Sequence, residues 1–399
     1  MSKPTDYDTW LGDDGPAALV IRQPLVPVEG PDGVFFPATF AAGDGFPGGY
    51  NIDVFPSDSD AAQVARGLGY TKSYKPSIAQ FPSARNVCLV DSVGSQANRI
   101  EPLFAKEKYR HLVPQVTITA GDKTVNLLDA GHRAGDALLR STKLQTELEA
   151  AFKAALAGDD APLAKVAPTS LVFGVWDSRK TQAKRPRLVA STVRAFDVRL
   201  NTRSAVYVPP VNYVGMDVFS DEEKSKAEGD SKNPLSKRGF VNALASGTHG
   251  GVTATGGVRR DATLSLAALR LLKGKTPKDE QRLRRYVLGL ALVALTTPGE
   301  TYLRAGCNLV PDVDQPSTFT LVGSDGSREK LKLTHAEALV FAAAAAEAFG
   351  VGEDKQVTFD KALAKQDVTD AGEAKKAKAA KKDKAAKGVE PTTAVEEVS

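Results

Sequence analysis

Short apolar runs separated by turn-forming residues mark the first part of the chain. Up to about residue 85 the sequence is rich in Gly, Pro and Asp, and runs such as Ala17–Ile21 and Val34–Phe36 predict short strands joined by turns. Val87–Val90 is a compact apolar run that suits a buried strand. From Ser92 to Ile100 apolar residues recur at i, i+4 and i+7, which predicts a helix.

The middle of the chain changes repeatedly between strand and helix patterns. Val113–Ile118 and Thr124–Leu128 predict the two arms of a hairpin, because a Gly-Asp turn lies between them. Ser141–Leu156 has the pattern of a helix. Leu171–Val175 and Leu188–Leu200 are strand-like, and alternation is clear in the second of them.

Loop, glycine and helix patterns follow in turn. Phe219–Arg238 is polar and charged and predicts a long loop. After the glycine-rich stretch 247–257, apolar repeats in Leu264–Leu272 and Leu283–Ala291 predict two helices, and His335–Phe349 predicts a further, alanine-rich one.

The character of the chain changes at Lys361. Residues 375–387 are mostly Lys and Ala, and an acidic end follows, so residues 361–399 are expected to be a disordered tail that buries too little apolar surface to fold. Residues 1–360 then form the folded part. Its strands, intervening helices and antiparallel pairs favour an α+β fold.

Composition sets limits on the class of protein. The chain has 399 residues, 42% of them hydrophobic, and only two cysteines, Cys88 and Cys307, which argues against a disulfide scaffold or a zinc site. The N-terminus lacks the layout of a signal peptide, and the longest apolar run, Tyr286–Leu295, is too short for a bilayer span. A cytoplasmic protein without membrane contact is expected.

Positive charge is concentrated although the net charge is only +4. One cluster has a single acid, Asp197, and a second series of arginines follows it. The first cluster is Arg179, Lys180, Lys184, Arg185, Arg187, Arg194, Arg199 and Arg203, and the second series is Arg238, Arg259, Arg260, Arg270, Arg282, Arg284 and Arg285. Such density attracts polyanions. A solvated basic face is the alternative.

Catalytic patterns are weak. The four histidines share no metal-ligand spacing, and both cysteines lie in apolar settings that suit inert, packed thiols. Asp91, Asp177 and Asp261 are candidates for acid–base or metal chemistry, but the sequence gives no pair of them a shared face. We therefore expect neither an enzyme nor a cofactor.

Two segments are candidates for nucleic-acid contact. Arg259-Arg260-Asp261 precedes the first helix expected after the glycine-rich stretch, where two arginines would seat a phosphate, unless Asp261 caps that helix. Trp176 ends a strand-like run and either stacks a base or packs in the core, of which the core is favoured. Arg185-Pro186-Arg187 suits backbone contact or a solvated edge.

Four motifs, in order, resemble a known family. They are Ser95-Gln96-Ala97-Asn98-Arg99-Ile100-Glu101, Phe173-Gly174-Val175-Trp176-Asp177-Ser178, Arg185-Pro186-Arg187-Leu188-Val189-Ala190-Ser191, and Gly250-Gly251-Val252 through Val258-Arg259-Arg260-Asp261-Ala262. Over residues 85 to 310 the chain resembles the large RAMP-superfamily CRISPR protein of type I-G systems, formerly type I-U.

The resemblance implies a modified RRM-like (ferredoxin-like) palm with helical and β-hairpin insertions, one of which is a thumb; Phe219–Arg238 is a candidate for it. It implies a Cascade backbone subunit that binds CRISPR RNA, forms a helical filament with copies of itself and other Cascade subunits, presents the guide to the target DNA strand, and leaves cleavage to a helicase-nuclease. The residues it implies for RNA contact are Gln96, Asn98, Arg99, Arg179, Arg185, Arg187, Gly250, Gly251, Arg259 and Arg260. Asn98 and Glu101 are also candidates for a purely structural role.

Two rivals remain open. One is a RAMP-type endoribonuclease that processes precursor CRISPR RNA, with His249 as the only residue placed to act. The other is a nucleotide-binding enzyme that uses the loop at 247–260.

Overall fold

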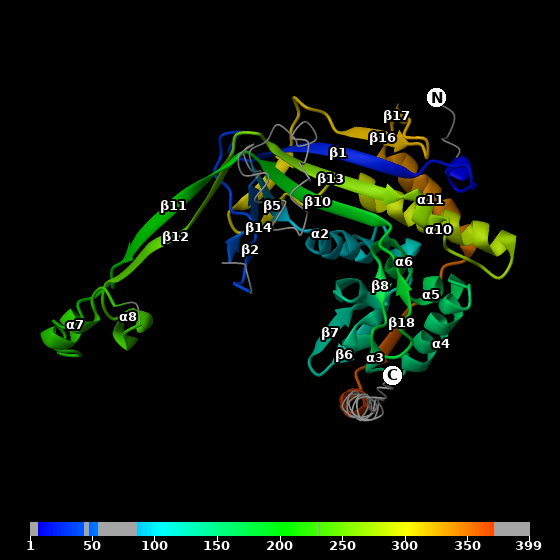
Figure 1. Ribbon diagram of the computed structural model, residues 1–399. Helices are drawn as coiled ribbons and strands as arrows, with labels where there is room; N and C mark the ends of the chain where they lie inside the picture. Colours follow the sequence, from blue (N-terminus) through cyan, green and yellow to red (C-terminus); the bar gives the residue numbers. More distant parts are fainter. Residues whose placement is uncertain (1–6, 44–47, 55–85, 231, 371–399) are drawn as a thin grey trace, which may run out of the picture.

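The palm is a βαββαβ unit in a computed structural model that describes residues 7–43, 48–54, 86–230 and 232–370 (Figure 1). Its strands are β1 (Ala18–Pro27), β10 (Val189–Phe196), β13 (Val258–Ser265) and β15 (Cys307–Pro311), and its helices are α2 (Val93–Ile100) and α10 (Pro277–Thr296). The sheet order β15-β1-β13-β10 is fully antiparallel, as a ferredoxin-like palm requires. The α+β, RRM-like expectation is confirmed.

Further strands widen this sheet at both edges. The β10 edge gains β5 (Asn86–Asp91) and β4 (Ile52–Val54), and the β1 side gains β14 (Tyr302–Arg304), β16 (Thr318–Val322) and β17 (Arg328–Leu331). A short hairpin, β2 (Thr39–Phe40) with β3 (Gly49–Tyr50), lies apart from it.

Helices cover one face of the sheet, because apolar residues alternate along the strands and recur at helical spacing along the helices. Along β13, Val258, Arg260, Ala262 and Leu264 are buried, whereas the residues between them are partly exposed. Helix α10 is apolar from Tyr286 to Leu295 and packs against α11 (His335–Phe349) under the sheet. None of the described helices forms such a layer over the other face of the palm (Figure 1).

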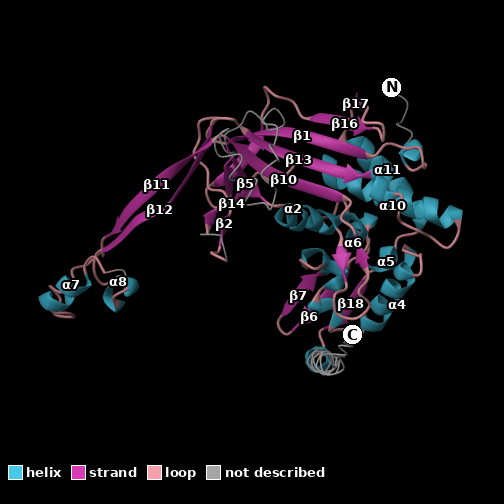
Figure 2. Cartoon of the chain, viewed as in Figure 1, coloured by secondary structure: helices cyan, strands magenta, loops and turns pink. Residues whose placement is uncertain are grey.

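A second lobe lies beyond α2 (Figure 2). It holds the sheet β18-β6-β7, four short helices and a two-stranded ribbon. Its elements are β6 (Val116–Ala120), β7 (Lys123–Asn126), β18 (Lys355–Thr358), α3 (Ala137–Arg140), α4 (Gln145–Leu156), α5 (Ala161–Val166), α6 (Thr169–Phe173), β8 (Val175–Trp176) and β9 (Lys184–Arg185). The hairpin expected at Val113–Leu128 is thus confirmed as β6–β7.

A long hairpin projects from the end of the palm, and we call it the arm (Figures 1 and 2). It consists of β11 (Val198–Tyr207) and β12 (Ala243–Ala254), and its tip holds α7 (Asp221–Ala227) and α8 (Pro234–Arg238). The long loop expected over Phe219–Arg238 is therefore wrong: Ser220 forms a capping box with Glu223 and starts α7.

Two other sequence predictions are wrong for related reasons. Leu171–Val175 is mostly helix α6, because a short apolar run suits a buried helix as well as a strand. The helix expected at Leu264–Leu272 is only the short α9 (Leu266–Leu269), since β13 continues to Ser265 with hydrogen-bonded partners on both sides.

The expected tail begins with structure. Residues 361–370 are helical, Asp360 accepts hydrogen bonds from the N–H groups of Ala362 and Leu363, and Arg140 lies 3.3 Å from Asp367. Disorder from Lys361 is thus wrong for these residues, and the rest of the expected tail, 371–399, lies outside the described residues. None of the described helices has the length and apolar character needed to cross a membrane.

Candidate nucleic-acid interface

Three neighbouring strands place arginines on the open face of the palm. The register sets Arg22 of β1 opposite Asp261 of β13, and Arg259 of β13 opposite Arg194 of β10. The side chain of Arg22 is 63% exposed and that of Arg259 is 35% exposed. Arg259 donates two hydrogen bonds to Asp261, at 2.8 and 3.0 Å. We call Arg22, Arg194 and Arg259 the arginine row. Asp261 pairs with Arg259 and lies 4.0 Å from Arg22, whereas Arg194 Nη1 donates to Thr192 Oγ1 at 2.8 Å.

The phosphate seat expected at a helix N-terminus does not exist. Arg259 and Arg260 lie in the middle of β13, and a strand sends successive side chains to opposite faces. Arg259 therefore belongs to the open face, where it also lies over the Phe196 ring, 4.8 Å from the centroid. Arg260 points to the helical face.

Three of the sequence motifs meet at Arg260. Its Nε donates to Ser191 Oγ at 3.0 Å, and Ser191 Oγ donates to Gln96 Oε1 at 2.9 Å. Gln96 Nε2 in turn donates to Asp91 Oδ2 at 2.7 Å. These hydrogen bonds link β13, β10, α2 and β5. Gln96, which is 6% exposed, therefore helps to hold the palm together.

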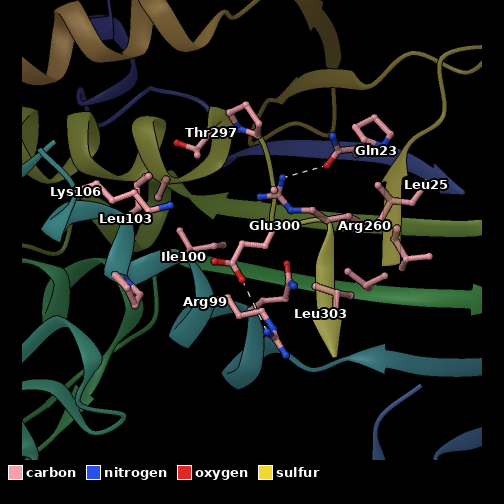
Figure 3. Close-up of a pocket in the computed structure, with 18 residues that line it drawn as sticks. Gln23, Leu25, Arg99, Ile100, Leu103, Lys106, Arg260, Thr297, Glu300 and Leu303 are labelled. Carbon is pink, nitrogen blue, oxygen red and sulfur yellow. Dashed lines mark hydrogen bonds and ion pairs between the residues drawn. The ribbon is translucent and has the colours of Figure 1, made fainter. Parts of the chain in front are cut away.

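Asp91 is the ion-pair centre of that network. It is fully buried, and its carboxylate accepts from Arg304 Nη2 at 2.6 Å, Ser95 Oγ at 2.8 Å and Arg99 Nε at 3.3 Å. Arg99 keeps a side-chain exposure of 26%. Arg99 and Arg260 both line one cavity, in which Arg99 lies beside Glu300 (Figure 3).

The end of α2 contains a second buried ion pair. Glu101 Oε2 lies 2.6 Å from Arg133 Nε, and both side chains are at most 6% exposed. Burial raises the pKa of Glu101 to about 7, although Arg133 acts in the opposite direction. The structural role considered for Glu101 is confirmed. Asn98 is exposed, with its Oδ1 3.5 Å from Arg133 Nη2.

The ribbon β8–β9 presents the second motif at the surface. Trp176 is 57% exposed, and Lys184 Nζ lies 6.0 Å from its ring centroid, so the core position favoured from the sequence is wrong. Asp177 accepts hydrogen bonds from Thr181 N at 2.8 Å and Thr181 Oγ1 at 2.7 Å. Burial by itself would raise the pKa of Asp177, but these bonds and those from the following backbone lower it.

The basic residues of this ribbon have different roles. Arg179 is exposed at the loop fixed by Asp177, and Arg187 is exposed with its Nε bonded to Phe173 O at 3.0 Å. Arg185 instead pairs with Asp160 and bonds to Ala155 O. Arg185 therefore joins the ribbon to α4 and α5, and its side chain is 19% exposed.

Gly250 and Gly251 lie in β12, at the base of the arm, and form no loop. At Gly251, φ is +87°, and a Cβ there would lie 2.7 Å from Val34 Cγ1. A Cβ on Gly250 would lie 2.6 Å from Asn201 O. Both glycines thus allow the arm to pack closely. The stretch 247–260, which the nucleotide-binding alternative treated as a loop, is strand, turn and strand.

The base of the arm also holds the histidine considered for catalysis. The rings of His249 and Tyr50 are 4.7 Å apart. Each of the three candidate acids accepts hydrogen bonds from neighbouring groups: Asp91 from Arg304, Asp177 from Thr181, and Asp261 from Arg259. Among the described residues, no group of His, Cys, Asp and Glu side chains is arranged to hold a metal ion.

The strands of the arm carry exposed basic and apolar side chains. Arg199 and Arg203 are exposed on β11, and neither β11 nor β12 contains an acidic residue. Leu200 and Val206 of β11 and Leu244 of β12 are 57–64% exposed. A thin hairpin with this surface offers contacts to an anionic or apolar partner.

Both cysteines are inert by position. Cys88 and Cys307 are 0% exposed, and burial raises their pKa values to about 12 and about 11. We predict that iodoacetamide at mildly alkaline pH labels both thiols at least about 100-fold more slowly in the native chain than in urea, as followed by mass spectrometry. Rapid labelling of the native chain would contradict this placement.

Comparison with known proteins adds a similarity to one protein family. Residues 19–200, a little under half of the chain, match the family described as CRISPR-associated protein GSU0053. The match indicates a CRISPR-associated protein. The matched segment runs from β1 into β11. It includes six of the residues expected at RNA, namely Gln96, Asn98, Arg99, Arg179, Arg185 and Arg187. A search among curated proteins finds no match.

Proposed function

We propose that the chain is the repeating backbone subunit of a type I-G CRISPR surveillance complex and grips the CRISPR RNA by its sugar-phosphate backbone. Copies of the chain line the guide in a helical filament beside other Cascade subunits. The guide pairs with the target DNA strand, and a separate helicase-nuclease cuts that DNA. The chain itself then needs neither a catalytic group nor a cofactor. It acts in the cytoplasm. The CRISPR-associated match supports the defence role.

The observation that carries this proposal is the arginine row. Arg194 and Arg259 lie directly opposite each other on adjacent strands, an arrangement that is unfavourable for like charges alone. A phosphate bound between the two guanidinium groups is attracted by both and offsets their repulsion. Contacts of this kind fix the position of a strand without reading its sequence, which suits a protein that must accept any guide.

The arm extends this basic surface. Only Asp197 separates β10, which carries Arg194, from β11, which carries Arg199. The exposed Arg199 and Arg203 therefore continue the positive charge from the palm onto the arm. A projecting element of this type suits an RNA-bound assembly, since it reaches beyond its own palm (Figure 2).

Charge removal tests the proposal. We expect Arg194→Ala/Arg259→Ala to weaken binding of single-stranded RNA at least about tenfold, equally for unrelated sequences, and to reduce the slope of log K against log salt by about 1.4. The matched control is Lys275→Ala/Lys278→Ala, which removes two exposed charges at the start of α10, on the helical side of the palm, and is expected to change neither quantity. Filter binding at several salt concentrations measures both.

Co-purification gives a complementary test. The chain expressed with a CRISPR array is expected to carry discrete guide RNAs on an elongated particle, identified by sequencing the bound RNA. Equal RNA affinity and salt slope in the wild type and the Arg194/Arg259 variant would contradict the assigned surface. A nucleic-acid-free monomer would contradict the backbone role.

A further inference from the structure

A partly open cavity lies between the palm sheet and its two helices. Its volume is about 100 Å³, whereas a single water needs only about 10–15 Å³, so it exceeds the voids of an ordinary core. Its floor is formed by β1, β10 and β13, and its sides by α2, the end of α10 and β14. Figure 3 shows the lining side chains converging on this space.

The floor contains a buried positive charge without a counter-ion. Arg260 is 6% exposed, and burial lowers its pKa to about 10. Within the described part of the chain it donates to two neutral oxygens, Ser191 Oγ at 3.0 Å and Gln23 Oε1 at 3.2 Å, and takes part in no ion pair. A guanidinium has five N–H groups, so others remain for a ligand in the cavity.

The walls of the cavity are mostly apolar, and its mouth is charged. The walls are formed by Leu25, Ile100, Leu103, Val193, Leu303 and Leu309. Arg99, Lys106 and Glu300 line the same cavity and are more exposed than Arg260. Apolar walls with a few placed polar groups are typical of sites for organic ligands.

The chemistry of the floor favours a neutral, planar ligand over a bare phosphate. A phosphate would have to lose its hydration between apolar walls, and it would find only the remaining N–H groups of Arg260 as charged donors. A nucleobase needs only one or two hydrogen bonds there and gains from apolar contact on its faces. Its phosphate would remain at the mouth, near Arg99 and Lys106.

We propose that this cavity binds a single nucleobase, with a base edge against Arg260 and the attached phosphate at the mouth. All four bases present a carbonyl or ring-nitrogen acceptor, so Arg260 accepts any of them and the site does not depend on the guide sequence. The inference rests on the proposed function, since RNA is the source of the base, but free nucleotides test it separately.

The test uses the four ribonucleoside monophosphates with the full-length chain in equilibrium dialysis. We expect all four to bind within about tenfold of each other and ribose 5-phosphate not to displace them. Ala294→Leu, which fills the cavity from α10 without removing a charge, is expected to weaken binding at least about tenfold, as is Arg260→Met. The matched control, Ala344→Leu on the exposed side of α11, is expected to bind as the wild type does.

Two results would overturn the proposal. Displacement by ribose 5-phosphate as strong as by a nucleotide would mean that the ligand is the phosphate, and wild-type affinity in the Ala294→Leu variant would place the site elsewhere. Filter binding of long RNA separates this inference from the proposed function: RNA binding without nucleotide binding refutes the cavity alone. Nucleotide binding without RNA binding supports the cavity and refutes the backbone role.

Discussion

Glu101→Ala is expected to lower the free energy of unfolding by about 3–5 kcal/mol, because it leaves a buried arginine without its counter-ion. Arg133 is 5% exposed, and the carboxylate it would lose lies 2.6 Å away. Its other contacts are weak: Gly174 O at 3.4 Å, Asn98 Oδ1 at 3.5 Å and the Phe173 ring, 5.3 Å from the centroid. Urea unfolding at about pH 8, where the Glu101 carboxyl is ionised, followed by circular dichroism measures the loss.

The double variant Glu101→Leu/Arg133→Met provides the control, because replacing both charges with apolar groups removes the unpaired ion. It should recover most of the stability that Glu101→Ala loses. If the double variant is as unstable as the single one, the loss comes from packing and the ion-pair argument fails.

The same pair predicts a pH dependence. Burial holds the folded-state pKa of Glu101, about 7, above its ordinary value, so the folded chain gains a proton as pH falls. The stability that the protonated Glu101 carboxyl contributes is therefore present at low pH and is lost as pH rises through about 7. Relative to the wild type, the apolar double variant should become more stable from about pH 5 to about pH 8; an unchanged difference would contradict the shift.

Asp91→Ala is expected to cost about 3 kcal/mol, near the lower end for a broken buried ion pair, because water reaches its two arginines. The side chains of Arg99 and Arg304 are 26% and 24% exposed, whereas Asp91 is fully buried. The change also removes the acceptor of Gln96 and so loosens the attachment of α2 to the sheet.

Thermal and urea unfolding measure this loss, with Asp314→Ala, an exposed aspartate, as the control that should change stability by less than about 0.5 kcal/mol. Since α2 positions Arg99, RNA or nucleotide binding by any folded Asp91→Ala protein should also weaken. A loss below about 1 kcal/mol would show that Asp91 is not the ion-pair centre of the palm.

The motifs in the sequence identified segments that meet in the fold, but not the partners of their side chains. Gln96 and Arg185, both expected at RNA, are held by Asp91 and Ser191 and by Asp160. These partners come from segments distant in sequence, for which spacing gives no signal. The arginine row was missed at Arg22 for the same reason, because only strand pairing brings β1 beside β13.

The sequence by itself determined the α+β class, the strand at β5, the helices α2, α10 and α11, and the hairpin β6–β7, because each depends on a local period or a turn. Tertiary structure decided the rest. Arg259 and Arg260 are adjacent in sequence, yet one lies on the open face and the other on the floor of a cavity. The reason is that strand pairing on both sides extends β13 to Ser265 and overrides the local helical pattern, and a strand sends neighbouring side chains to opposite faces.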